Sequence, residues 1–71
     1  MEIIKMIPKI HIRIDTSSAA FGSGRMERNI ELKRILSKII EDLDQGRSIY
    51  DQWPLLDLNG NTVGSLSAEE K

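Results

Sequence analysis

Hydrophobic and polar residues alternate most regularly between positions 9 and 15, where the chain reads Lys-Ile-His-Ile-Arg-Ile-Asp. A period of two places alternate side chains on opposite faces of a β-strand, and β-branched residues favour that conformation. One face would carry Ile10, Ile12 and Ile14, and the other Lys9, His11, Arg13 and Asp15. The same parity reaches back to positions 6 and 4. Pro8 cannot donate to a strand ladder, so we predict the secure strand from position 9 onward.

The spacing becomes helical after Gly24. Apolar residues recur at intervals of three and four, as they do on one face of an amphipathic helix. These apolar residues are Leu32, Ile35, Leu36, Ile39, Ile40 and Leu43, and charged residues such as Lys33, Arg34, Lys38, Glu41 and Asp42 fill the other side. With Ser23 as the N-cap and Gly46 as a left-handed C-terminal cap, the helix is predicted from about Gly24 or Arg25 to Gln45.

A β-hairpin is predicted in the last third of the chain, where the apolar runs 55–58 and 62–66 flank Asn59-Gly60. A type I′ turn at Asn59-Gly60 would pair Leu58 with Asn61 and Leu56 with Val63. The tail from 67 to 71 is polar, so we expect it to fray.

The oxygen-bearing side chains at 57, 59 and 61 share the alternate spacing of a calcium loop. Thr62 stands where such a loop needs Gly, and Ala68 stands where it needs Glu. The segment is therefore interpreted as a turn, and no metal or cofactor is expected.

These elements predict a single α+β domain over residues 1–71, with its secure core at about 9–66. The order is β-α-β-β, and one long helix packs on one face of a three-stranded sheet. The inward residues would be Ile10, Ile12, Ile14, Leu56, Leu58 and Val63. Phe21 and Trp53 lie in predicted loops, and burial is the expectation for both. Whether the first strand is central or at an edge stays open.

The composition disfavours several classes of function without identifying one. Ten Lys and Arg balance eleven Asp and Glu, which gives a net charge of −1 and no strong global field toward nucleic acid or anionic membrane. The chain has no Cys and one His, which disfavours disulfides, thiolate chemistry and transition-metal sites. We expect no signal peptide and no membrane span, and hence a cytoplasmic protein.

A further set of residues supports a family resemblance. Ala19-Ala20-Phe21, Ile35-Leu36 in the helix, Gly46 and the run Asp57-x-Asn-Gly-Asn-x-Val63-Gly64 occur in this order after an alternating strand. Together they resemble a group of small uncharacterised phage and prophage proteins. The resemblance implies a mobile-element origin within a bacterial host and this fold, and it implies no particular reaction.

No catalytic motif accompanies this pattern. Gly22-Ser23-Gly24 lacks the following Lys of a phosphate loop, and no glycine-flanked nucleophile precedes a helix. We therefore expect a non-enzymatic protein.

We expect that the chain acts by binding another protein. The candidate contact residues are Lys9, His11, Arg13, Tyr50, Trp53 and Asp57. The alternative is a nucleic-acid-binding regulator that uses Lys9, Arg13, Arg25, Arg28, Lys33 and Arg34. A two-fold dimer is also considered, because basic residues begin the helix and acidic residues end it, against its own dipole.

Overall fold

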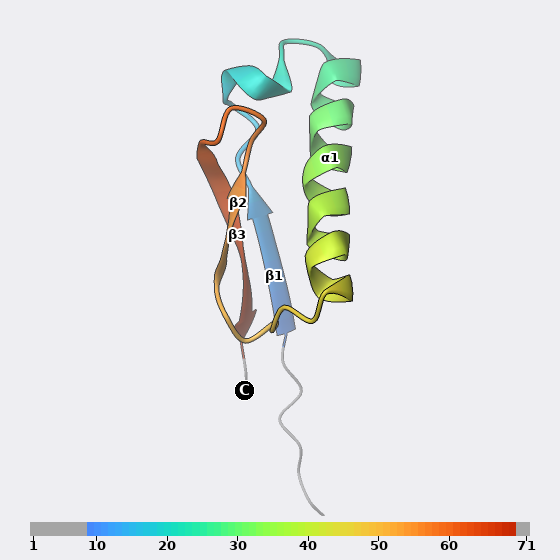
Figure 1. The fold of residues 1–71 in the computed structure, drawn as a ribbon. Coiled ribbons are helices and arrows are strands. Elements are labelled where there is room, and N and C mark those ends of the chain that lie inside the picture. Colours follow the sequence, from blue (N-terminus) through green and yellow to red (C-terminus); the bar gives the residue numbers. More distant parts are fainter. Residues whose placement is uncertain (1–8, 70–71) are drawn as a thin grey trace, which may run out of the picture.

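The computed structural model describes residues 9–69 and contains three strands and one long helix (Figure 1). Their bounds are β1 (Lys9–Ile14), the short 3-10 helix η1 (Ala19–Phe21), α1 (Arg25–Asp44), β2 (Trp53–Leu56) and β3 (Thr62–Glu69). The α+β class and the strand-helix-strand-strand order are as predicted. The extension of the first strand back to positions 4 and 6, across Pro8, lies outside the described residues.

β3 is the central strand of the sheet, whose order is β1-β3-β2. It pairs antiparallel with both neighbours, so β1 and β2 run parallel to each other with β3 between them. α1 connects these two parallel strands, so β1, α1 and β2 form a crossover connection. The point left open by the sequence is answered: β1 is an edge strand.

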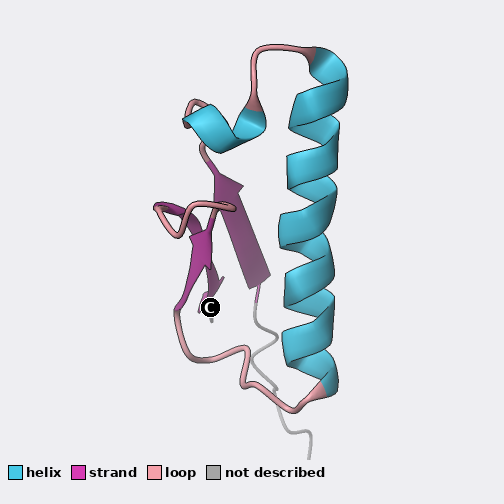
Figure 2. Cartoon of the chain, turned by 45° about the horizontal axis from the view of Figure 1, so that its top comes forward, coloured by secondary structure: helices cyan, strands magenta, loops and turns pink. Residues whose placement is uncertain are grey.

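α1 lies along one face of the sheet and runs in the opposite direction to β1 (Figures 1 and 2). Ile35 and Ile39 of the helix are buried against the sheet, and Leu32 packs beside them. Phe21 of η1 is fully buried, as expected, and belongs to the same core. The buried core residues are Phe21, Ile35, Ile39, Trp53, Leu55, Val63 and Leu66.

The helix ends close to its predicted bounds. Its N-cap is Gly24, whose carbonyl accepts the Arg28 N–H at 3.1 Å, so the prediction of Ser23 is wrong by one residue. At the other end Gly46 has φ of 89°, and the N–H groups of Gly46 and Arg47 bond the carbonyls of Leu43 and Asp42. This is a Schellman ending, and the predicted role of Gly46 is confirmed.

The hairpin turn differs from the prediction. A type I′ turn needs positive φ at both central residues, and within residues 9–69 only glycines have positive φ. The Gly60 N–H instead bonds the Asp57 carbonyl at 3.0 Å, and the Asp57 N–H bonds the Asn61 carbonyl at 2.8 Å. Within this turn only Gly60 has a positive φ, and the pairing of β2 with β3 shows a register shift between Leu55 and Leu56.

The inward face of β2 was wrongly predicted. Trp53 and Leu55 are buried, whereas Leu56 and Leu58 are exposed. Alternation places either the odd or the even residues of this strand inward, and Trp53 offers the larger apolar surface to bury. The prediction that the chain frays from Ser67 is also wrong, because β3 continues to Glu69 and pairs it with Lys9.

Candidate functional site

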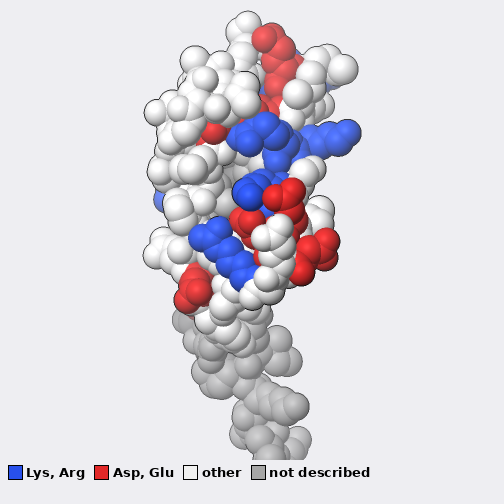
Figure 3. Space-filling view, viewed as in Figure 1, with Lys and Arg blue, Asp and Glu red and all other residues white. Residues whose placement is uncertain are grey.

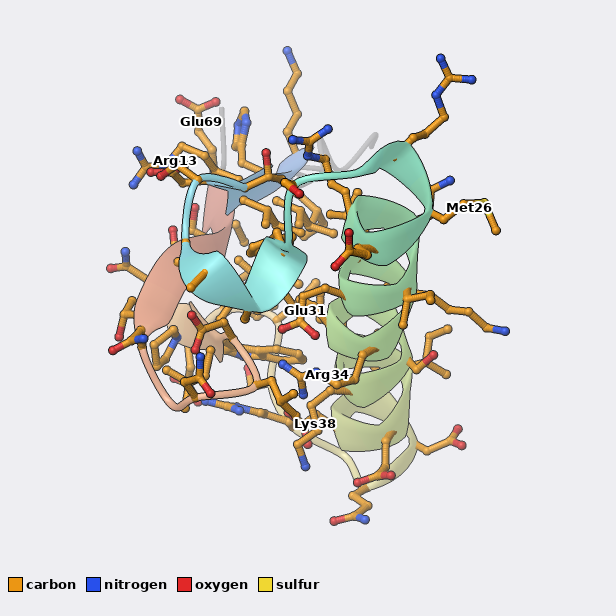
Figure 4. The ribbon with its side chains drawn as sticks, turned by 90° about the horizontal axis from the view of Figure 1, so that it is seen from above. Arg13, Met26, Glu31, Arg34, Lys38 and Glu69 are labelled. Carbon is orange, nitrogen blue, oxygen red and sulfur yellow. The ribbon has the colours of Figure 1, made fainter. Side chains whose placement is uncertain are left out.

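The most buried acidic group of α1 is Glu31, which is 4% exposed. Arg34, one turn further on, donates to both carboxylate oxygens through Nε at 2.9 Å and Nη2 at 3.0 Å (Figure 4). The Leu58 N–H donates to Oε2 of Glu31 at 2.8 Å, which ties the helix to the hairpin loop. Glu31 was not among the residues predicted to be buried, although its position four residues before Ile35 places it on the same face of the helix as the apolar residues.

Asp57 is the second buried carboxylate and organises the hairpin loop. Its Oδ1 accepts the N–H groups of Asn59 and Asn61, each at 2.9 Å. Its Oδ2 accepts the Ser18 hydroxyl at 2.8 Å and the Asn61 amide at 3.3 Å. These bonds join the loop before η1 to the hairpin and explain the Asp-x-Asn-Gly-Asn run. Asp57 is therefore removed from the candidate partner contacts, because its oxygens are buried and already bonded.

The environments of both carboxylates favour the ionised form. The Arg34 hydrogen bonds hold the pKa of Glu31 below its ordinary 4.5 despite the opposing effect of burial. Burial raises the pKa of Asp57, but hydrogen bonds from Asn61, Ser18 and Asn59 outweigh it and lower that pKa from its ordinary 3.8. Both groups thus stabilise the fold as anions.

The free energy of unfolding should therefore fall at acid pH. Since both pKa values are lower in the folded chain than in the unfolded chain, the unfolded state binds more protons below about pH 4.5. We expect a level melting temperature from neutral pH to about pH 5 and a decline below it. Asp57→Asn should melt lower than the parent at neutral pH, and the gap should narrow as the pH falls. Asp51→Asn, at an exposed position, is the control, and a gap for Asp57→Asn that is constant with pH would contradict this account.

Trp53 is 1% exposed, so its expected burial is confirmed and it is removed from the candidate contacts. Its indole N–H donates to the Ser48 carbonyl at 2.8 Å, and the Arg47 guanidinium lies 4.6 Å from the ring centre. Arg47 also pairs with Asp42 at 3.1 Å. Trp53 therefore anchors the connection between α1 and β2. Tyr50 in the same connection is exposed.

The remaining predicted contacts lie on the sheet face that α1 does not cover. Lys9, His11 and Arg13 are exposed there, and Nε2 of His11 is 3.1 Å from Oε1 of Glu69 on β3. Figure 4 shows Arg13 and Glu69 on the side of the sheet away from α1. This face is polar, as predicted, and β1 forms one of its edges.

The basic residues of the nucleic-acid alternative do not form one surface. Lys9 and Arg13 lie on β1, and the other four lie on α1 behind the sheet. At 3.6 residues per turn, Arg28, Lys33 and Arg34 point in widely different directions around the helix. The guanidinium of Arg34 also donates hydrogen bonds to the Glu31 carboxylate and, at 2.9 Å, to the Leu56 carbonyl. In Figure 3 positive and negative side chains lie next to one another, so no patch of one sign dominates this face.

An apolar strip is left open where α1 overhangs β1. We call it the apolar seam, and it consists of Ile10, Ile12, Leu36, Ile40 and Leu43, which are 42%, 46%, 44%, 63% and 44% exposed. All five were predicted to lie in the core. The apolar arc of the helix is wider than the surface that a three-stranded sheet can cover, so its outer part stays open.

Two observations place the helical part of the seam on the β1 side. Arg34 and Lys38 border a hollow together with Trp53 and Pro54 of β2. Arg34 precedes the buried Ile35 and Leu36 follows it, so their side chains project to opposite sides of Ile35 around the helix. Since Arg34 is on the β2 side, Leu36 is on the β1 side. Ile12 lies opposite the buried Leu66, so its side chain is on the helix-facing side of the sheet.

The backbone of β1 is unpaired along the same side. The Asp15 N–H donates to the Val63 carbonyl at 2.7 Å, and the backbone groups of a strand residue alternate in direction along the strand. Odd-numbered residues of β1 therefore bond β3, and the N–H and C=O groups of Ile10, Ile12 and Ile14 point outward. No other strand of residues 9–69 covers this edge.

The opposite edge of the sheet is closed to strand addition. β2 has only four residues and contains Pro54, which has no N–H. A register shift interrupts it between Leu55 and Leu56, and the Leu56 carbonyl accepts a hydrogen bond from Arg34. Short strands, prolines and bulges are the features that keep an edge from pairing. The two edges thus differ in kind, and only β1 offers a regular one.

No family model, curated protein or solved structure matches this chain. Within the part of the chain that the structure describes, no helix has the length and apolar character needed to cross a bilayer.

Proposed function

We propose that this chain is a non-enzymatic protein-binding module that takes a partner strand along the outer edge of β1. The observation that carries the proposal is the coincidence of an unpaired backbone edge with the apolar seam. An added strand would bond the outward N–H and C=O groups of Ile10, Ile12 and Ile14. Its inward side chains would cover the seam, so one partner satisfies both features.

The polar residues of β1 fit the same partner. In a sheet, directly opposite side chains on one face lie within reach of each other. Lys9, His11 and Arg13 would thus face alternate residues of the added strand on the uncovered side of the sheet. Main-chain bonds and the seam would supply affinity, and these three side chains would select the partner.

The two buried carboxylates also support a non-enzymatic role. Glu31 is held by Arg34 and Leu58, and Asp57 by Ser18 and two asparagines. Their observed bonds connect elements of the fold and leave them no role as an accessible acid or base. The resemblance to small phage and prophage proteins favours an accessory role within a bacterial host, and this context belongs to the proposal.

Photocrosslinking in living bacterial cells tests the binding edge. Benzoylphenylalanine would replace Ile12 or Leu43 in the apolar seam, and in a matched control it would replace the exposed Gln52 beside the closed edge. We expect protein adducts from the two seam positions and only background from position 52. Equal adducts at all three positions, no adducts at the seam, or adducts that a nuclease removes would contradict the proposal.

A further inference from the structure

We infer that the strand which binds β1 is β1 of a second copy, paired antiparallel about a two-fold axis between the two Ile12 residues. This inference rests on the proposed function and specifies its partner. It would join two three-stranded sheets into one continuous sheet with both α1 helices on the same face. The alternation of backbone groups, the charge pattern and the seam each support it.

The backbone limits the possible registers. Only even-numbered residues of β1 have outward N–H and C=O groups, so in a symmetric antiparallel pair an even residue must face an even residue. Three registers meet this condition. The axis can pass between the two Ile12 residues, between the two His11 residues or between the two Arg13 residues, so that the named residue faces its own copy. Registers further along would pair fewer residues of the six-residue strand.

Charge selects among these registers. An axis at His11 would place Lys9 opposite Arg13 of the second copy, and an axis at Arg13 would place two Arg13 side chains opposite each other. Like charges directly opposite are destabilising. With the axis at Ile12, Lys9 faces Asp15 and His11 faces Arg13 of the second copy, each twice, and Ile10 faces Ile14. Of the three registers, this one alone places Lys9 opposite an acidic residue. This register pairs opposite charges on the outer face and β-branched side chains on the inner face.

The same two-fold symmetry would cover the apolar seam of each copy with that of the other. Since α1 lies over the sheet and runs opposite to β1 (Figure 1), the two-fold axis brings the β1-side flanks of the two helices toward each other in antiparallel order. Leu36, Ile40 and Leu43 of each copy would meet those of the other across the axis.

Disulfide trapping tests the register, because the parent chain has no Cys and each variant carries one. In the inferred dimer the two residues at position 12 form a hydrogen-bonded pair with Cα atoms about 5.5 Å apart, within the range of a disulfide. Residues at position 11 would be diagonal neighbours, about 7–8 Å apart and out of range. We expect Ile12→Cys to form covalent dimers in a glutathione buffer roughly tenfold faster than His11→Cys or Gln52→Cys, given this geometric requirement.

Sedimentation of the parent chain over a range of concentrations gives the second measurement. We expect a reversible monomer–dimer equilibrium that Leu43→Lys shifts to monomer, while circular dichroism shows that this exposed-site variant stays folded. Faster trapping of His11→Cys, or equal trapping of all three variants, would overturn the inferred register. If the chain is a monomer at every concentration, and the seam adducts formed in cells differ in mass from a crosslinked dimer of this chain, the partner is not a second copy. The proposed binding edge would still stand in that case.

Discussion

Trp53→Ala is expected to leave the chain largely unfolded. Trp53 is 1% exposed, and deletion of a buried aromatic side chain costs about 3–5 kcal/mol. A domain of this size has only about 3–5 kcal/mol of stability from its core, so the loss is of the same order as the total. The change also removes the indole bond to Ser48 and the stacking of Arg47.

Far-UV circular dichroism and urea titration measure the effect of Trp53→Ala. Tyr50→Ala is the control, because Tyr50 lies in the same connection and is 60% exposed. It should change the free energy of unfolding by no more than about 0.5 kcal/mol. A cooperative urea transition of Trp53→Ala close to that of the parent would show that the indole is not a core anchor.

Gly64→Ala is expected to separate β1 from β3. A Cβ atom at Gly64 would overlap the carbonyl oxygen of Arg13 and lie 2.8 Å from its carbonyl carbon and 3.0 Å from the Cα of Ile14. These are backbone atoms of a paired strand, so no side-chain rotation relieves the overlap. In an unstrained site the loss of glycine would stabilise by about 0.4–1 kcal/mol, and the clash reverses that sign.

The expected cost of Gly64→Ala is at least about 1–3 kcal/mol, the usual range for overpacking. Residue-resolved amide exchange should show that His11 and Arg13 lose protection before the residues of α1. Ser65→Ala, at the next position of β3, is the matched control and should leave β1 protected. Unchanged protection at His11 and Arg13 in Gly64→Ala would contradict the close approach of the two strands.

Local periodicity predicted the elements well. The isoleucine alternation defined β1, and the three-and-four spacing with Gly46 defined α1 almost to its last residue. These features depend on neighbours along the chain, whose side-chain directions follow from the backbone geometry alone. The Asn-Gly pair correctly predicted a hairpin, but the Asp57 carboxylate bonds the loop N–H groups and favours a longer turn.

Which apolar residues are covered could not be predicted from periodicity. Ile12 and Leu36 carry the pattern of core residues, yet both are nearly half exposed because β1 lies at the edge of the sheet. The strand order decides this, and strand order depends on contacts between segments distant in the sequence. Glu31 illustrates the reverse case, since its burial depends on Arg34 and on a hairpin loop 27 positions further along.

Some of the polar and aromatic contact candidates are exposed and others are buried, and the difference again depends on contacts between distant segments. Lys9, His11 and Arg13 lie on an exposed face because strand alternation placed them there, as the sequence indicated. Trp53 was expected to be buried and could have served as a contact only if it were exposed, and Asp57 was a candidate because Leu56 and Leu58 were predicted to face inward. β2 begins at Trp53 and carries it inward, and the hairpin encloses Asp57 directly after that strand.

Amide hydrogen exchange along β1, measured at several protein concentrations, tests the central claim most directly. The N–H groups of His11 and Arg13 bond β3 within one copy and should be protected at every concentration. Those of Ile10, Ile12 and Ile14 point to the open edge, so they should exchange rapidly in dilute solution and become protected as the concentration rises. Protection of the three isoleucines at the lowest concentration, or rapid exchange at the highest, would contradict a β1 edge that is open in one copy and paired between two.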